Sequence, residues 1–126
     1  VCQRFKRCTM KEIRAYIQPF MLSKVTLALK QIAGFPGMSI IEIQGFGRGK
    51  VLVPEDRIVR EFVPKIRLET MVKEELVDEV VHAIEKAAHT GNPGDGVIFV
   101  LPVEQAVRIR TGERDKAAIR SMKNEK

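Results

Sequence analysis

The apolar residues of this chain recur at two spacings, and the order of these spacings constrains the fold most strongly. Residues 11–18 alternate between apolar and polar side chains, which is typical of a half-buried strand. From Ser23 the apolar side chains recur at helical spacing, and Gly34 is a candidate for the residue that ends this helix. Residues 38–46 are rich in isoleucine and predict a second strand. The first half of the chain therefore predicts strand–helix–strand.

The second half repeats this order. Residues 64–71 alternate like a strand, and residues 73–89 carry an apolar stripe with acidic residues in the first turn and basic ones in the last. Residues 97–101 are apolar throughout, and residues 106–110 extend that strand beyond an interruption at Pro102. The polar residues that follow are expected to fray.

Two consecutive strand–helix–strand units predict an α+β fold. The arrangement that fits them is the ferredoxin-like βαββαβ order, an antiparallel sheet with both helices on one face. A length of 126 residues suits a single domain of this kind. The strands are apolar enough that we expect a partner subunit to cover the second face of the sheet.

The net charge of +6 lies at the two ends of the chain. Residues 1–14 carry +4, residues 116–126 carry +3, and the middle carries −1. We expect residues 1–9 to be a disordered basic leader, residues 10–114 to form the domain, and residues 115–126 to be a polar basic tail. A near-neutral body does not favour a nucleic-acid partner. No apolar run reaches the ~18 residues of a membrane-spanning helix.

Two segments are candidates for binding an anion. Residues 90–96 hold three glycines, whose backbone N–H groups can approach a phosphate closely, although the same glycines suit a simple turn from a helix into a strand. Arg108 and Arg110 would lie on the same face of a strand and could hold a phosphate chain. The alternative for this pair is a solvated edge strand.

Two further groups of residues are candidates for other kinds of site. The run from Gly45 to Lys50 superficially resembles an RNA-recognition signature, but basic residues stand where stacking aromatic side chains are needed. His82, Glu85 and His89 recur at helical offsets and could hold a metal ion, although solvated side chains explain them more simply. We find no nucleophile with a His–acid relay and no paired buried carboxylates, so the sequence does not predict an enzyme.

Several of these blocks together resemble the P-II signal-transduction family. The resemblance covers residues 10–119, and its TG-x-x-GDG and RIRTGE blocks are specific in combination. It makes Met10 a candidate for the natural first residue. The blocks that carry it are Met10-Lys11-Glu12-Ile13, Pro19-Phe20, Gly45-Phe46-Gly47-Arg48, Pro64-Lys65, Thr90-Gly91 with Gly94-Asp95-Gly96, and Val107 to Glu113.

The resemblance implies a cytoplasmic homotrimer that binds ATP, ADP or AMP in clefts between subunits, with a role for Mg²⁺ left open. It implies a regulator of the nitrogen-signalling type, whose exposed loop at residues 47–62 reports energy or metabolite state to an enzyme or to a membrane transporter at the inner membrane face. The implied nucleotide-binding residues are Ser39, Gly45, Phe46, Gly47, Arg48, Lys65, Gly94, Asp95, Gly96, Arg108 and Arg110. The implied effector-loop residues are Lys50, Val53, Pro54, Glu55, Asp56 and Arg57.

Departures from the family pattern indicate a divergent branch with a shortened effector loop. Gly49 stands where the family has a glutamine that helps to hold Mg²⁺ and 2-oxoglutarate, so sensing of 2-oxoglutarate in the usual manner is not expected. Val97 stands where a lysine meets phosphate, which favours ADP or AMP over ATP. Residues 47–63 contain no Ser, Thr or Tyr, so the loop offers no hydroxyl for uridylylation. Such branches are associated with other transport systems, including cation efflux.

An alternative from another class is a trimeric divalent-metal-binding protein similar to the cation-tolerance family, which shares this fold. That family would lack the RIRTGE phosphate clamp, so the clamp argues against it.

Overall fold

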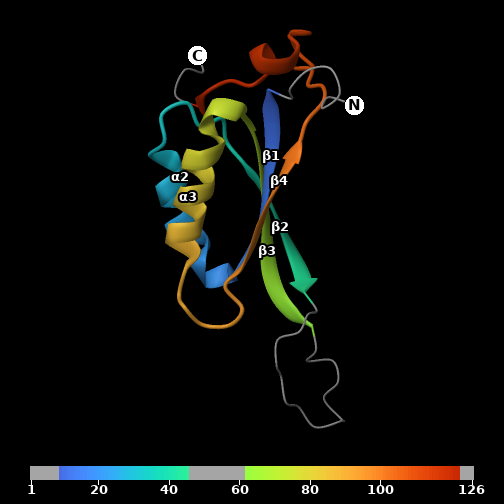
Figure 1. Ribbon diagram of the computed structural model, residues 1–126. Coiled ribbons are helices and arrows are strands. Elements are labelled where there is room, and N and C mark those ends of the chain that lie inside the picture. The colour runs from blue at the N-terminus through green and yellow to red at the C-terminus, as the bar shows by residue number, and fades with distance from the viewer. Residues whose placement is uncertain (1–8, 46–61, 123–126) are drawn as a thin grey trace.

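The computed structural model describes residues 9–45 and 62–122 and contains one four-stranded sheet (Figure 1). All neighbouring strands are antiparallel, in the order β2-β3-β1-β4. The predicted ferredoxin-like α+β arrangement is therefore confirmed. The strands are β1 (Met10–Ile17), β2 (Ser39–Gly45), β3 (Val63–Lys73) and β4 (Gly96–Pro102).

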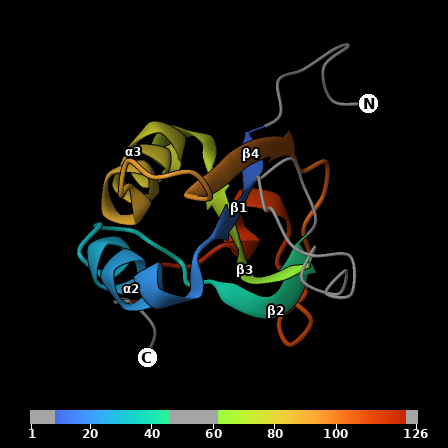
Figure 2. The ribbon, with the colours of Figure 1, turned by 90° about the horizontal axis from the view of Figure 1, so that it is seen from below.

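Both helices lie on one side of the sheet (Figure 2). Helix α2 (Leu22–Lys30) follows the 3₁₀ turn η1 (Pro19–Met21), and helix α3 (Val77–Ala88) follows the 3₁₀ turn η3 (Glu74–Leu76). Within the described ranges, neither helix has the length and apolar character that a membrane crossing requires.

The core lies between the helices and the inner face of the sheet. Alternate residues of the two central strands point into it, as the period-2 pattern predicts, because successive side chains of a strand face opposite sides. The helices contribute the residues of their apolar stripes. The fully buried side chains of largest volume are Ile13, Ile17, Leu29, Leu68, Ile84, Val25, Val72 and Val80.

The first helix ends earlier than its apolar stripe predicts. Ile32 is buried as expected, but α2 ends at Lys30, and the Ile32 amide donates to the Leu29 carbonyl (3.1 Å) in a tighter turn. Gly34 has φ of +87° and lies in this turn, so it does not cap the helix directly. Ile32 therefore remains in the core although α2 ends before it.

The predicted strand at 106–110 is wrong. The Arg108 amide donates to the Glu113 carbonyl (2.9 Å) and the Gly112 amide donates to the Arg108 carbonyl (2.7 Å), so the chain reverses. The reason lies in the pairing of β4, where Pro102 is already opposite Lys11, near the start of β1. Among residues 9–45 and 62–122, no strand remains for residues 106–110 to pair with. Val107 makes an isolated bridge to Arg114.

The segment after this turn does not fray as expected. It forms a short 3₁₀ helix, η4 (Asp115–Ala118), near the upper end of the sheet in Figure 1. Ala118 is buried, with 9% of its surface exposed, and the Met122 amide donates to the Phe35 carbonyl (2.9 Å). The burial of Ala118 and this hydrogen bond fix a segment that is polar in sequence.

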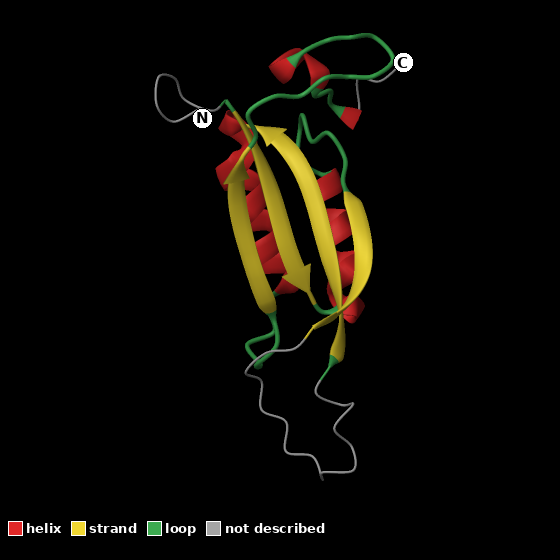
Figure 3. Ribbon diagram, turned by 90° about the vertical axis from the view of Figure 1, so that its right-hand side faces the viewer, coloured by secondary structure: helices red, strands yellow, loops and turns green. Residues whose placement is uncertain are grey.

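The outer face of the sheet is unlike an ordinary solvated face. Figure 3 shows this face in front of the helices. An ion-pair chain crosses it, in which Arg14 Nε lies 3.0 Å from Glu12 and 4.0 Å from Glu69, and Arg67 Nη2 lies 2.6 Å from Glu69. Large apolar side chains lie on both sides of this row of ion pairs. They include Ile41, Met71, Val97 and Phe99, each of which is exposed.

A substitution at Gly96 would test the close backbone packing between β4 and β1. A Cβ added at Gly96, whose φ is +112°, would lie 1.7 Å from the Tyr16 carbonyl oxygen. Gly96→Ala should therefore lower the free energy of unfolding in urea by at least ~3 kcal/mol. Gly112→Ala is the matched control, since Gly112 also has a positive φ but open space around it. This control should cost about 1 kcal/mol, and equal losses would contradict the packing described.

Candidate functional site

The glycine-rich loop at residues 90–96 is organised around the carboxylate of Asp95. This carboxylate accepts hydrogen bonds from the Thr90 hydroxyl, from the Thr90 amide (2.7 Å) and from the Gly91 amide (2.8 Å). The Thr90 hydroxyl also accepts from the Asn92 amide (3.1 Å). The hydroxyl of Thr90, together with the two amides, holds the pKa of Asp95 at about 2, well below its usual range. Asp95 thus shapes the loop from within.

Lys65 joins this loop to the end of the sheet. Its Nζ donates to the Gly94 carbonyl (2.6 Å). A Cβ added at Gly45 would lie 3.2 Å from Cγ of Lys65, and one added at Gly94 would lie 3.4 Å from Nε2 of Gln18. The ends of β2 and β3 and the loop before β4 therefore meet. This lower group consists of Gly45, Lys65, Gly94, Asp95 and Gly96.

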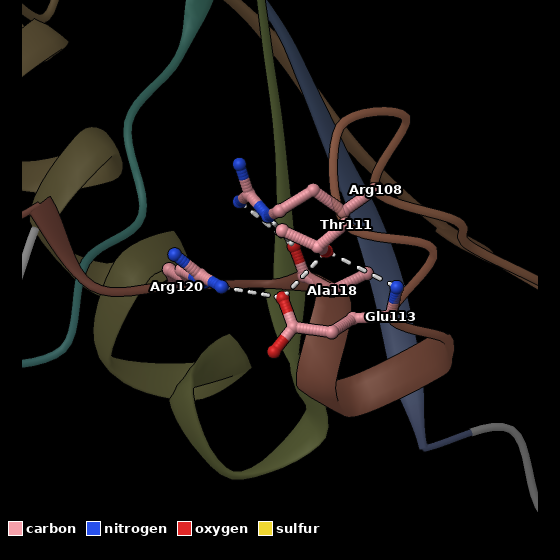
Figure 4. A network of polar contacts seen from close by, with 5 residues as sticks. All are labelled: Arg108, Thr111, Glu113, Ala118 and Arg120. Carbon is pink, nitrogen blue, oxygen red and sulfur yellow. Dashed lines mark hydrogen bonds and ion pairs between the residues drawn. The ribbon is translucent and has the colours of Figure 1, made fainter.

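A second group of predicted residues gathers elsewhere on the chain. Ser39 and Arg108 line one cavity of about 500 Å³, between the start of β2 and the segment after β4. Nε and Nη2 of Arg108 both donate to the Ala118 carbonyl (3.1 and 2.8 Å; Figure 4). Arg110 is exposed and takes part in none of the described hydrogen bonds. The expectation that both arginines share one face of a strand is therefore wrong, because they lie in a turn.

The two groups lie at different ends of strand β2. Ser39 begins the strand and Gly45 ends it, so about 20 Å of extended chain separates them. One subunit thus carries two separate sets of the residues that the sequence assigns to a single site. We call them the lower half-site (Gly45, Lys65, Gly94–Gly96) and the upper half-site (Ser39, Arg108).

The remaining predicted site residues lie outside the described ranges. For the nucleotide these are Phe46, Gly47 and Arg48. For the effector loop these are Lys50, Val53, Pro54, Glu55, Asp56 and Arg57.

The metal-site hypothesis for His82, Glu85 and His89 is corrected by the structure. Helix α3 ends at Ala88, and His89 is extended (φ −72°, ψ 127°), so it leaves the helical face on which the offsets place it. Its Nδ1 lies 3.8 Å from Asp95 Oδ2 instead. Among residues 9–45 and 62–122, no cluster of three His, Cys, Asp or Glu side chains could hold a metal ion.

Sequence reasoning missed one polar network, formed by the C-terminal strap (residues 113–122). Glu113 Oε1 accepts from the Thr111 hydroxyl (2.9 Å) and from Arg120 Nη2 (2.5 Å), and these two contacts lower the pKa of Glu113 (Figure 4). From the sequence, Arg120 was predicted only to be part of the basic tail at residues 115–126. The apolar Ala117-Ala118-Ile119 within that tail is the signal that could have revealed packing.

The pKa of Asp95 makes loop stability dependent on pH. A carboxylate whose pKa is depressed in the folded state stabilises it fully above its ordinary pKa, and this contribution is lost as the pH falls through about 2. The difference in unfolding free energy between wild type and Asp95→Asn should therefore shrink between about pH 5 and about pH 2. Urea unfolding at several pH values measures it.

Glu42→Gln serves as the control, because Glu42 is an exposed carboxylate on β2. A constant difference between wild type and Asp95→Asn across this pH range would contradict the role assigned to Asp95.

Comparison with known proteins agrees with this fold. A family model described as nitrogen regulatory protein P-II matches residues 10–113. Proteins named nitrogen regulatory protein P-II are similar over 113 residues, at 46% identity in Azospirillum brasilense and 48% in Haemophilus influenzae. Each match covers 87% of this chain and 100% of the relative.

A solved structure extends the likeness to three dimensions. The crystal structure of Arabidopsis thaliana PII bound to citrate superposes with a TM-score of 0.75 at 35% identity. The match covers 89% of this chain and 94% of the other. The family model, the relatives and the solved structure lead to one conclusion: this chain belongs to the nitrogen regulatory protein P-II family.

Proposed function

We propose that this P-II protein binds an adenine nucleotide between subunits and reports it to a target protein. The observation that carries the proposal is the separation of the two half-sites by the length of β2. A cleft in which the lower half-site of one subunit faces the upper half-site of another would combine them. Backbone amides and Lys65 would then approach the ligand from one side and Arg108 from the other.

A trimer is the assembly proposed to bring the half-sites together. The exposed apolar residues on the outer face of the sheet support it, since an apolar surface of this kind marks an association site. Tyr16 and Phe99 pack edge to face there, with ring centroids 6.1 Å apart. The ion-paired side chains of Arg14 and Glu69 would help to fix how the subunits align in an otherwise apolar interface.

This assembly predicts the effect of a charge on the outer face. Wild type should scatter light as a particle of three times the 14.2 kDa chain mass. Phe99→Glu should lower that mass, because a carboxylate would have to be desolvated in the interface. Phe20→Glu is the control, since Phe20 is 71% exposed but lies on η1, away from the sheet face. Equal masses for both variants would contradict the proposal.

Nucleotide choice is proposed to depend on Val97, the residue after the Gly-Asp-Gly turn. Val97 is 49% exposed at the start of β4, beside the lower half-site. An apolar side chain here gives no charge-assisted hydrogen bond to a phosphate. ADP or AMP should therefore bind at least as tightly as ATP.

Calorimetric titration with ATP, ADP and AMP is the deciding experiment. Val97→Lys should strengthen ATP binding by about tenfold relative to AMP, the effect of one added charged hydrogen bond. Val97→Met, which adds length without charge, should leave the ratio unchanged. If none of the three nucleotides binds wild type at about millimolar concentration, the nucleotide function is wrong.

Signal output is proposed to pass through residues 47–62 to a transporter or enzyme. The support is the family membership and the position of the segment, which connects the adjacent ends of β2 and β3 beside the lower half-site. A ligand bound at that half-site would contact the base of the loop. From the family resemblance we propose a cation-efflux transporter as the partner. We also propose a cytoplasmic location with recruitment to the inner membrane face.

A further inference from the structure

We infer that the C-terminal strap competes with a phosphate-bearing ligand for the guanidinium of Arg108. This inference rests on the proposed function, because it concerns how the same site is regulated. The strap would then be an internal inhibitor, and its release would signal that the upper half-site is occupied.

The contact between Arg108 and the strap engages the edge of the guanidinium best suited to an anion. Nε and Nη2 converge on the single carbonyl oxygen of Ala118, at 3.1 and 2.8 Å. Two parallel N–H groups are the donors by which arginine holds phosphate oxygens. The same two donors cannot serve the carbonyl and a phosphate together. The Ala118 carbonyl therefore occupies the position that a phosphate oxygen would take on this arginine.

The strap also has contacts that hold it in place at both ends. Near its start, the Asp115 amide donates to the Ala106 carbonyl (2.8 Å), and the Ala106 amide donates to Oδ1 of Asp115 (3.2 Å). Near its end, Arg120 pairs with Glu113 and the Met122 amide reaches Phe35. Ala118 lies buried between these anchors. The strap is thus a defined conformation that can be lost as a unit.

The cavity of the upper half-site brings the competitors together. Arg108, Ala118 and Arg120 all line it, across from Ser39. A ligand that entered this cavity would meet Arg108 already bound to the strap. The ligand must then either use only the guanidinium N–H groups that the strap leaves free or break the two hydrogen bonds to Ala118, so the docked strap lowers the observed affinity.

The strap can first be tested without any nucleotide. Arg108→Gln should increase the hydrogen-exchange rate of the Met122 amide by roughly tenfold, because the strap loses its central attachment. Arg114→Gln is the matched control, as Arg114 is an exposed arginine whose side chain makes none of the described polar contacts. Unchanged exchange at Met122 in Arg108→Gln would overturn the inference.

Competition is tested by expelling the strap from an intact upper half-site. Ala118→Asp places a carboxylate at a buried position, whereas Ala117→Asp adds the same charge at the exposed neighbour. Ala118→Asp should bind ADP at least about threefold more tightly than Ala117→Asp. In wild type, saturating ADP should increase exchange at Met122. Arg120→Gln, compared with Arg114→Gln, repeats this test by removing the ion pair between Arg120 and Glu113.

Exchange of the Ile13 and Ala15 amides in β1 verifies that each variant remains folded. If wild type binds ADP but Ala118→Asp and Arg120→Gln bind no more tightly than their controls, the competition is wrong and the proposed function stands. If neither wild type nor any variant binds a nucleotide, the proposed function fails and the competition fails with it.

Discussion

Strand β1 makes the contacts on which the rest of the structure depends. It pairs with β3 along one edge and with β4 along the other, so both halves of the chain join through its backbone. Its inner side chains, Ile13, Ala15 and Ile17, are almost completely buried beneath the helices. Its outer face carries Arg14 and Tyr16, which contribute to the ion-pair chain and to the aromatic contact. The core, the sheet and the proposed interface therefore share one strand.

Spacing in the sequence predicted most of this fold, and the errors have identifiable physical causes. The strand predicted at 106–110 has genuine alternation, but alternation reports only which side chains could share a face and not whether a partner strand exists. Ile109, apolar and predicted to be in that strand, is 97% exposed. The strap was missed for the converse reason, since its order depends on Ala118 and on backbone hydrogen bonds that leave no periodic signal.

For the candidate site too, the residue types could be predicted from the sequence, but their positions in space could not. The glycine loop and the arginines were found from local residue types, because each uses neighbouring backbone amides or a guanidinium. Their distribution into two half-sites could not be found that way, since it depends on strand register. Lys65 reaches Gly94 across 29 positions of sequence only because β3 and β4 both begin at the end of the sheet where β1 finishes. The family comparison assigns the whole chain to P-II, while the strand bounds show that the two groups lie at opposite ends of β2.

The internal carboxylate of the glycine loop has a consequence for the thermodynamics of recognition. A glycine-rich segment ordinarily loses much conformational entropy when it closes around an anion. Here Asp95 already holds the Thr90 and Gly91 amides, so this ordering is completed during folding. The loop is thus ordered before any ligand arrives. Were it to bind the proposed anion, its affinity would reflect the contacts made and not a loss of chain entropy.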